Sequence, residues 1–202
     1  MIAIIDYDVG NLFSLRSSLT HLGLEAVVTA DAQTIRKADR LILPGVGAFG
    51  DAMDKLSATG LVPVIREEAA KKPLLGICLG MQLLFEKSCE YGEHDGLGFV
   101  PGQVCPLAPD LGDKSLKVPQ IGWNALHIVR DDPLFRYIRE GEYVYYVHSY
   151  YGKNCTGSTL AVSDYSIPVT GVVRAGRVYG TQFHPEKSGE TGLRILKAFA
   201  EL

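Results

Sequence analysis

The sequence of 202 residues lacks the features of a secreted, disulfide-stabilised or membrane-spanning protein. It has only four cysteines, which lie far apart and include no C-x-x-C pair: Cys78, Cys89, Cys105 and Cys155. This spacing excludes a disulfide framework and the common zinc patterns. No apolar run is long enough to span a membrane, and the first apolar segment is too short for a signal peptide. We therefore expect a cytoplasmic protein with reduced thiols.

A strong bias of charge is also missing. The sequence has 20 Lys and Arg against 23 Asp and Glu, a net charge of −3, and no basic stripe. Such a chain is not expected to bind nucleic acid as its main partner. No linker, repeat or low-complexity segment interrupts the sequence, so residues 1–202 are expected to form one domain. The apolar fraction of 47% is ordinary for a globular chain.

The first half of the chain alternates short apolar runs with helical periodicity. In order, it predicts a strand over 2–6, a helix over 11–22, strands over 26–28 and 41–44, a helical stretch over 49–72 broken near 60–63, a strand over 74–78 and a helix over 81–86. This alternation predicts a parallel sheet covered by helices on both faces.

The second half changes character. Its β-rich runs over 143–151, 160–164, 169–174 and 178–183 are separated by turn residues, and an amphipathic helix over 191–202 closes the chain. Such runs predict antiparallel strands added to the parallel sheet. The expected fold class is therefore α/β.

The most informative segment is Gly76–Gly80, with the sequence Gly-Ile-Cys-Leu-Gly. It has the G-x-nucleophile-x-G form of a nucleophile elbow, and it lies between a predicted strand and a helical segment, as an elbow requires. The glycines permit a sharp turn where a side chain would be crowded. The turn presents Cys78 above the first turn of a helix, where negative charge is favoured and a thiolate forms more readily. Taken alone, the segment fits a small buried cysteine equally well.

Gly45–Gly50 matches the G-x-G-x-x-G pattern of a dinucleotide-binding loop. Two observations argue against a dinucleotide: the loop follows the third predicted strand, and the next strand ends in Cys78 instead of an acidic residue. A glycine-rich strand end beside a nucleophile can direct backbone N–H groups at an oxyanion. The candidate donors are Gly45, Val46, Gly47 and the N–H of Leu79, although a plain strand-to-helix turn also uses glycine.

His184 is the best candidate for the general base. It ends a late apolar strand and is followed by Pro185 and Glu186. If the chain stays extended, Glu186 lies on the same side and holds one imidazole nitrogen while the other faces Cys78. The other histidines fit worse: His21, His94 and His127 suit solvated or capping positions, and His148 ends a β-run where it can line the same cleft. A zinc site of Cys78 and His184 lacks further ligands, so no metal or cofactor is expected.

These segments resemble the class I, or triad-type, glutamine amidotransferases. More narrowly, the sequence is similar to the glutaminase subunits of imidazole glycerol phosphate synthase, an enzyme of histidine biosynthesis. Four signatures carry the narrower resemblance from end to end of the chain: Asp6–Leu12, Pro44–Gly50, Pro119–Asn124 and His184–Ser188. Two positions depart from the family's pattern: Asp8 stands where a small residue or glycine is expected, and Gln120 where histidine is often found.

The resemblance implies a flavodoxin-like, three-layer fold with a mostly parallel central sheet and added antiparallel strands. It implies that Cys78 attacks the carboxamide of glutamine, that His184, held by Glu186, passes a proton to ammonia, and that a thioester is then hydrolysed to glutamate. The residues implied to bind glutamine and the oxyanion are Gly45, Val46, Gly47, Leu79, Gln82, His148, Ser149 and Tyr150.

The resemblance also implies a partner. Ammonia would pass to a cyclase subunit of the (β/α)8-barrel type, in a heterodimer that makes imidazole glycerol phosphate and aminoimidazole carboxamide ribotide. Trp123, the only tryptophan, fits a buried ring or an interface anchor, and the resemblance favours the interface. The implied interface residues are Gln120, Trp123, Asn124 and Lys187. The oxyanion loop is further implied to rest inactive until the partner is occupied.

Three other functions fit parts of the sequence. An amidotransferase subunit for anthranilate, guanine or carbamoyl phosphate synthesis would share the triad, and only the segments around Trp123 and Lys187 argue against it. A non-catalytic interaction protein of the same fold is disfavoured because all three triad residues are present. A stand-alone cysteine hydrolase would also use an elbow cysteine on this fold.

Overall fold

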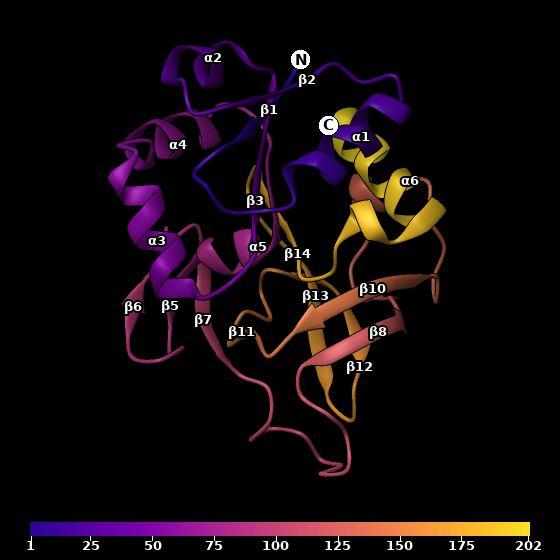
Figure 1. The fold of residues 1–202 in the computed structure, drawn as a ribbon. Helices are drawn as coiled ribbons and strands as arrows, with labels where there is room; N and C mark the ends of the chain where they lie inside the picture. Colours follow the sequence, from indigo (N-terminus) through magenta and orange to yellow (C-terminus); the bar gives the residue numbers. More distant parts are fainter.

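The central feature of the fold is an eight-stranded mixed sheet, seen in a computed structural model that describes all 202 residues (Figure 1). In spatial order its strands are β2 (Ala26–Thr29), β1 (Ile2–Ile5), β3 (Arg40–Gly45), β4 (Leu74–Cys78), β14 (Val178–Thr181), β13 (Pro168–Ala175), β12 (Thr159–Asp164) and β9 (His127–Ile128). The strands from β2 to β14 are parallel, and β13, β12 and β9 pair antiparallel. The expected sheet is confirmed, and its parallel part has the flavodoxin-like strand order.

Helices cover both faces of this sheet and give three layers (Figure 1). One face carries α1 (Leu12–His21) and α6 (Gly189–Ala200), and the other carries α2 (Ala32–Lys37), α3 (Phe49–Ala58) and α4 (Val62–Ala69). The alternation of side chains along β1 shows why both faces are apolar. Ile2 and Ile4 belong to the apolar cluster with α1 and α6, whereas Ala3 and Ile5 belong to the cluster with α2, α3 and α4.

Two smaller sheets extend the carboxyl edge of the central one. A four-stranded sheet has the order β11 (Tyr150–Lys153), β7 (Val100–Pro106), β5 (Phe85–Ser88) and β6 (His94–Asp95), and a two-stranded sheet pairs β10 (Tyr143–His148) with β8 (Gln120–Ala125). Two short 3-10 helices, η1 (Pro133–Phe135) and η2 (Pro185–Lys187), complete the structure. The turn between β10 and β11 brings both small sheets next to the ends of β3 and β4.

The prediction of a helix over 81–86 is wrong at its C-terminal end. Helix α5 spans only Leu79–Leu83, and β5 begins at Phe85. The side chain of Phe85 is fully buried, and its backbone pairs with Val100 in β7. Pairing with a later part of the chain therefore overrides the helical periodicity here.

Other expected elements differ in detail. The strand over 143–151 breaks at Ser149, and its two parts lie in the two small sheets instead of the central one. The strand over 178–183 ends at Thr181. Helix α2 was not expected; Asp31 caps it by accepting a hydrogen bond from the N–H of Thr34 at 2.8 Å. The other strands and helices of the first half, and the last helix, agree with expectation within about two residues at their starts.

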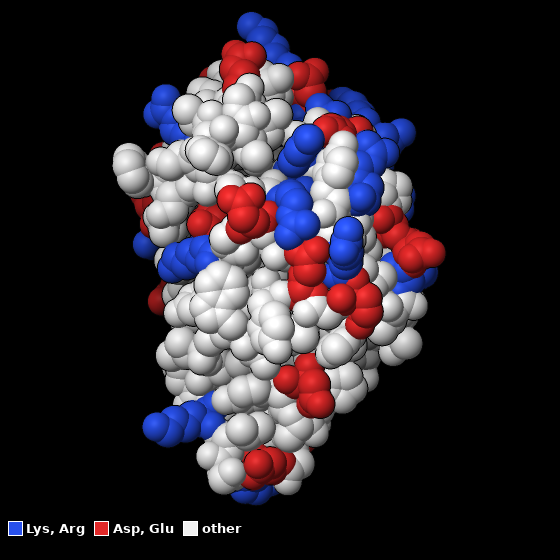
Figure 2. Space-filling model, turned by 90° about the vertical axis from the view of Figure 1, so that its right-hand side faces the viewer, with Lys and Arg blue, Asp and Glu red and all other residues white.

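Charged side chains are spread unevenly over the surface. Figure 2 looks onto the side that carries α6, β8 and β10, and it shows charges of both signs crowded over the upper half and a lower part with few charges. None of the helices has both the length and the apolar character that crossing a membrane requires.

Candidate active site

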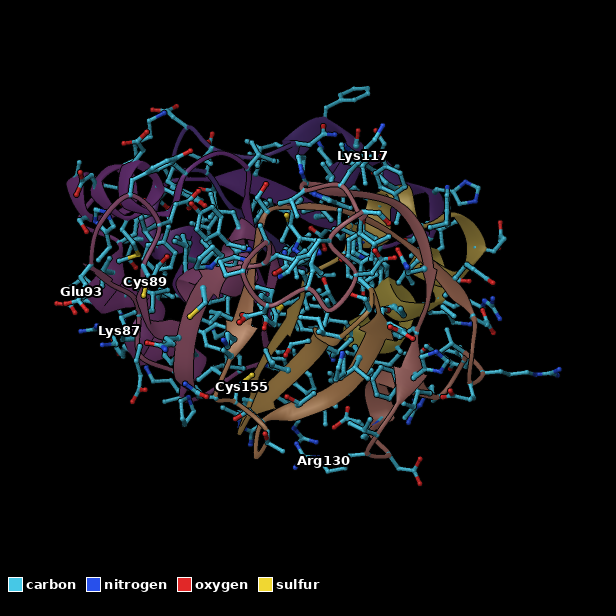
Figure 3. All side chains as sticks on the ribbon, turned by 90° about the horizontal axis from the view of Figure 1, so that it is seen from below. Lys87, Cys89, Glu93, Lys117, Arg130 and Cys155 are labelled. Atoms are coloured by element: carbon cyan, nitrogen blue, oxygen red, sulfur yellow. The ribbon has the colours of Figure 1, made fainter.

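Only one of the four cysteines lines the cavity at the carboxyl ends of β3 and β4, and it is Cys78. All four are free thiols. Cys89 is exposed and lies beside Lys87 and Glu93 at one edge of the molecule (Figure 3). Cys78 is 7% exposed, so its sulfur is shielded but reaches the cavity.

The backbone at Cys78 makes the sharp turn that the sequence predicts. Cys78 ends β4 and directly precedes α5, with φ 54° and ψ −112°, a conformation that residues with a side chain rarely adopt. A Cβ at Gly80 would lie 1.8 Å from the carbonyl oxygen of Leu43, and one at Gly76 would lie 2.6 Å from that of Gly80. The two glycines therefore let α5 pack directly on β3 and β4, which fixes where the thiol points.

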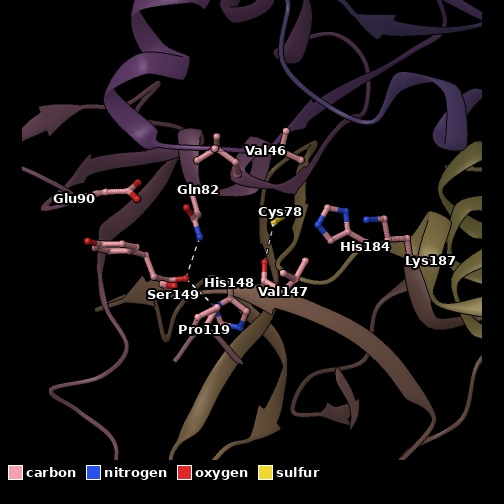
Figure 4. Close-up of a pocket in the computed structure, with 13 residues that line it drawn as sticks. Val46, Cys78, Gln82, Glu90, Pro119, Val147, His148, Ser149, His184 and Lys187 are labelled. Carbon is pink, nitrogen blue, oxygen red and sulfur yellow. Dashed lines mark hydrogen bonds between the residues drawn. The ribbon is translucent and has the colours of Figure 1, made fainter. Parts of the chain in front are cut away.

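His184 lies next to Cys78 (Figure 4) and forms a buried pair with Glu186. The Nδ1–H of His184 donates to the Oε1 atom of Glu186 at 2.8 Å, and both side chains are only 3% exposed. His184 is extended, as expected for the residue before a proline, but the chain does not stay extended because Pro185 begins η2. The turn carries the carboxylate back to the imidazole, and the backbone N–H of His184 anchors the segment to Tyr145 at 3.0 Å.

The charge of His184 is set by two opposing effects. Burial disfavours the imidazolium, but hydrogen bonds and charge interactions with Cys78 and Glu186 outweigh it and raise the pKa of His184 to about 9. The ring is therefore protonated at neutral pH. A protonated imidazole facing the Cys78 sulfur stabilises a thiolate there by direct attraction.

The cavity above this pair has a volume of about 350 Å³, which is large enough for a small polar molecule. Figure 4 shows Cys78 and His184 on one side of it and Gln82 and Glu90 on the other. The cavity is lined by Val46, Gly47, Cys78, Leu79, Gln82, Glu90, Pro119, Val147, His148, Ser149, Tyr150, His184 and Lys187. Of the residues expected to bind glutamine or its oxyanion, only Gly45 is missing from this lining; it ends β3 beside Cys78.

The loop after β3 carries free backbone donors. The N–H groups of Val46 and Gly47 take part in none of the hydrogen bonds of the turns and loops. Gly47 has φ +98°, a left-handed backbone that favours glycine. The base of the loop is held by Tyr7, whose hydroxyl donates to the carbonyl oxygen of Pro44 at 2.6 Å. The loop is thus fixed at one end and able to offer donors beside Cys78.

His148 lies in the same cavity, but its environment differs from that of His184. Its ring nitrogens lie 2.8 Å from the carbonyl oxygen of Tyr150 and 3.0 Å from the Oε1 atom of Gln120. Burial lowers the pKa of His148 to about 4. His184, whose pKa is raised instead, is the histidine suited to partner a thiolate.

Glu90 is a cavity residue that sequence reasoning missed. It is 8% exposed, and its Oε2 atom accepts a hydrogen bond from the N–H of Phe49 at 2.8 Å. Burial raises the pKa of Glu90. No lysine or arginine is paired with this carboxylate, so a cation in the cavity would stabilise its charge. Glu90 follows strand β5, and the pairing of β5 with β7 places it at the cavity. Nothing in the local sequence indicates this long-range pairing.

The residues expected at a partner interface fall into two groups. Trp123 is 52% exposed on β8, with its ring packed edge-on against Tyr145 at 5.8 Å, and Lys187 lines the mouth of the cavity. Gln120 is instead fully buried, and its amide donates to the Oδ1 atom of Asn124 at 2.9 Å. A buried amide cannot contact another chain directly, so Gln120 lies beneath the surface that Trp123 and Lys187 form.

No group of three or more His, Cys, Asp or Glu residues is arranged to hold a metal ion. The Gly45–Gly50 loop, considered above as a dinucleotide pattern, lines the Cys78 cavity with Val46 and Gly47 and continues into α3, whose first N–H is bonded to Glu90. A phosphate at this helix start would meet a carboxylate, which is repulsive. The loop therefore belongs to the cysteine site.

Comparison with known proteins gives a consistent result. The sequence model of the family "glutamine amidotransferase class-I" matches residues 3–201. The chain is 50% identical over 203 residues to imidazole glycerol phosphate synthase subunit HisH of Listeria monocytogenes, covering 100% of this chain and 96% of that protein. It is 50% identical over 200 residues to the Bacillus cereus protein of the same name, covering 98% and 93%, and 49% identical over 204 residues to that of Caldanaerobacter subterraneus, covering 100% and 98%.

The fold is also similar to solved structures with much lower identity. A glutamine amidotransferase crystal structure has a TM-score of 0.76 at 20% identity and covers 100% of this chain and 98% of its own. The structure of PurLQS from Thermotoga maritima has a TM-score of 0.76 at 17% identity and covers 99% and 97%. At these identities the similarity concerns the fold alone.

Proposed function

Because the chain belongs to the class I glutamine amidotransferases, and within them to the HisH subunits of imidazole glycerol phosphate synthase, we propose that residues 1–202 act as one cytoplasmic glutaminase domain that supplies ammonia to a synthase partner. The observation that carries this proposal is the Cys78, His184 and Glu186 arrangement at a cavity of about 350 Å³. A nucleophile, a protonated base and an orienting carboxylate are the groups that acyl transfer requires.

In the first step, the Cys78 thiolate attacks the side-chain carbonyl carbon of glutamine. The carbonyl oxygen becomes an oxyanion, which the N–H groups of Gly47, Val46 and Leu79 receive. The tetrahedral intermediate then collapses, the carbon–nitrogen bond breaks, and the imidazolium of His184 gives its proton to the departing amine. The products of this step are ammonia and a glutamyl thioester on Cys78.

In the second step, water replaces the sulfur. Neutral His184, held by Glu186, takes a proton from the water as it attacks the thioester carbon. The thiolate leaves, glutamate is released, and the imidazolium returns. The hydrogen bond of 2.8 Å between His184 and Glu186 keeps the ring in one orientation through both steps.

The other end of the cavity suits the amino-acid group of glutamine. Glu90 offers a buried carboxylate oxygen for the α-ammonium group, and Gln82 presents an amide from the helix that follows Cys78. The strand end at His148, Ser149 and Tyr150 supplies polar backbone beside Gln82. These positions select a substrate with a positive charge at one end and a carboxamide at the other.

Replacing Glu90 with glutamine is expected to raise the KM for glutamine by about 10- to 100-fold, because a charge-assisted hydrogen bond to the α-ammonium group is lost. The substitution keeps the oxygen that accepts from Phe49. Steady-state glutamate release in the complex measures the effect. Glu93→Gln, on the same segment but exposed, serves as the control and is expected to leave KM unchanged. An unchanged KM in Glu90→Gln would remove Glu90 from the binding site.

The partner in this proposal is a cyclase subunit of the (β/α)8-barrel type that forms a heterodimer with this chain. It uses the ammonia to make imidazole glycerol phosphate and aminoimidazole carboxamide ribotide. Free ammonia is protonated and lost in water at neutral pH, so direct transfer between subunits preserves the nucleophile. The exposed apolar side chains Ile121, Trp123 and Tyr143 on β8 and β10, with Lys187 and Asn124 near them, supply the docking surface.

Trp123→Ala is expected to weaken binding of the cyclase subunit by about 30-fold, since exposed tryptophans at interface centres contribute about 2 kcal/mol or more. Titration of the labelled cyclase subunit with this chain measures the dissociation constant. Val129→Ala, which also shortens an exposed apolar side chain, is the control. Equal dissociation constants for Trp123→Ala and the wild type would place the partner on another face.

The test of the whole proposal is glutamate release from glutamine by the chain alone, with the cyclase subunit, and with that subunit and its ligand. We propose that the oxyanion loop rests inactive, so release should rise when the occupied partner binds. Strong turnover of other amides without any partner would favour a stand-alone hydrolase. Activation by a different synthase component, for anthranilate, guanine or carbamoyl phosphate, would favour the alternative amidotransferase role.

A further inference from the structure

Gln182 is a buried polar residue that has no role in the proposed mechanism of glutamine hydrolysis. It follows β14, its side chain is fully buried, and its backbone N–H is bonded to Gly171 at 2.9 Å. Its side-chain Nε2 atom lies 3.8 Å from the sulfur of Cys78. Its Oε1 atom lies 3.1 Å from the Nε2 atom of Gln82. One amide therefore touches both the nucleophile and a side chain of the substrate cavity.

The hydrogen-bonding neighbours fix which way this amide points. The carbonyl oxygen of Tyr150 can only accept, so Gln82, at 3.0 Å from it, must present its nitrogen there. The same nitrogen faces Gln182, which must therefore present its oxygen. The remaining end of the Gln182 amide is its NH2 group, and that group faces Cys78. The Gln82 NH2 group thus donates both to the Tyr150 carbonyl and to the Gln182 side-chain oxygen, and the Gln182 NH2 group donates to the sulfur.

An N–H aimed at sulfur favours one protonation state. As a thiol, Cys78 can donate to the carbonyl oxygen of Val147, which lies 3.9 Å away. As a thiolate it has no proton to donate and accepts instead, and the available donors are Gln182 and the imidazolium of His184. A donor inside a buried site interacts more strongly with the charged form than with the neutral one. The Gln182 amide therefore stabilises the thiolate of Cys78 more than the thiol.

We propose that Gln182 is a positioning residue that holds the Cys78 thiolate through its side-chain N–H, with Gln82 and the Tyr150 carbonyl fixing the direction of that N–H. This inference rests on the proposed role of Cys78 as the nucleophile. Gln82 then has a second role: besides contributing to the substrate cavity, its side-chain amide orients the Gln182 N–H that donates to the Cys78 sulfur. Through this connection, a change at Gln82 alters the charge state of the sulfur without touching it.

The test is the pH dependence of Cys78 alkylation by iodoacetamide in the full-length chain, followed by peptide mapping so that only Cys78 is counted. Thiolate reacts and thiol does not, so the rate rises with pH around a midpoint. Gln182→Met keeps the shape and removes the donor, and it should move the midpoint upward by about one pH unit. Gln182→Glu replaces the donor with a negative charge and should move it further upward.

Gln33→Met on the exposed face of α2 is the matched control and should leave the midpoint unchanged. A midpoint that stays in place in Gln182→Met, or falls in Gln182→Glu, overturns the proposal. If both variants fail to show cooperative thermal unfolding, Gln82→Met decides the question. That variant frees the Gln182 amide to rotate and should also raise the midpoint, and an unchanged midpoint overturns the proposal.

The alkylation measurement is independent of glutamine turnover. Failure of the wild-type chain to release glutamate in the presence of an occupied partner would overturn the proposed function and leave the midpoint shift intact. A midpoint that does not move, in a chain that releases glutamate normally, would overturn the role of Gln182 alone.

Discussion

Cys78→Ser is expected to abolish glutamine-dependent synthesis in the complex, by at least about 10³-fold, while synthesis from added ammonia stays at the wild-type rate. The imidazolium of His184 stabilises the thiolate of Cys78. A serine hydroxyl is much harder to ionise than a thiol, so it stays protonated and is a poor nucleophile. Ammonia bypasses this step, because the cyclase site uses it directly. Product formation measured with each nitrogen source separates the two activities.

Cys89→Ser is the control for this substitution, since Cys89 is exposed at the edge of the molecule and outside the cavity (Figure 3). It should leave both activities unchanged. Retained glutamine-dependent synthesis in Cys78→Ser would show that another group is the nucleophile. Loss of both activities together would point to a damaged complex instead of a missing nucleophile.

Gly80→Ala is expected to prevent folding or to lower the free energy of unfolding by more than about 4 kcal/mol. The added methyl group would lie 1.8 Å from the carbonyl oxygen of Leu43, and a backbone atom cannot move aside as a flexible side chain can. Relief would require α5 to separate from β3, which displaces Cys78. Urea unfolding followed by circular dichroism measures the effect.

Gly157→Ala is the matched control, because a methyl group there would meet no atom within 4 Å and the backbone is not left-handed. It should change the free energy of unfolding by less than about 1 kcal/mol. A Gly80→Ala protein as stable as the wild type would mean that the elbow does not pack on β3 as described.

The sharp turn at Cys78 and the contact between His184 and Glu186 could be predicted from sequence because each depends on local pattern. Gly76–Gly80 is short, its turn needs glycine for steric reasons, and the strand before it is continuous and apolar. His184 and Glu186 are two residues apart, so their contact needs only one turn of chain. The extended backbone of His184 follows from Pro185, but the 3-10 turn that begins at Pro185 was not predicted.

Features that depend on distant pairing could not be predicted. The periodicity of residues 81–86 fits a helix, and only the pairing of Phe85 with β7 ends it early. The same pairing places Glu90, two residues after β5, at the cavity, so this buried carboxylate was missed. Gln182 was visible beside His184, but its contacts with Cys78 and Gln82 require the packing of β14 against β4.

The two departures from the family's pattern have structural explanations. Asp8 is exposed with φ 61°, a left-handed backbone where glycine fits well and aspartate is among the side chains that tolerate it. Gln120 replaces an expected histidine in a buried position, where it connects His148 to Asn124. Neither residue lines the cavity, so neither changes the triad.

The central claim is that glutamine becomes covalently attached to Cys78. Acid quenching of the complex during glutamine turnover, followed by peptide mass mapping, tests it most directly. We expect a glutamyl adduct on the peptide that contains Cys78, absent from Cys78→Ser and lost when the quench is delayed until glutamine is consumed. Turnover at the wild-type rate with no adduct on Cys78, or with the adduct on Cys89, Cys105 or Cys155, would contradict the account.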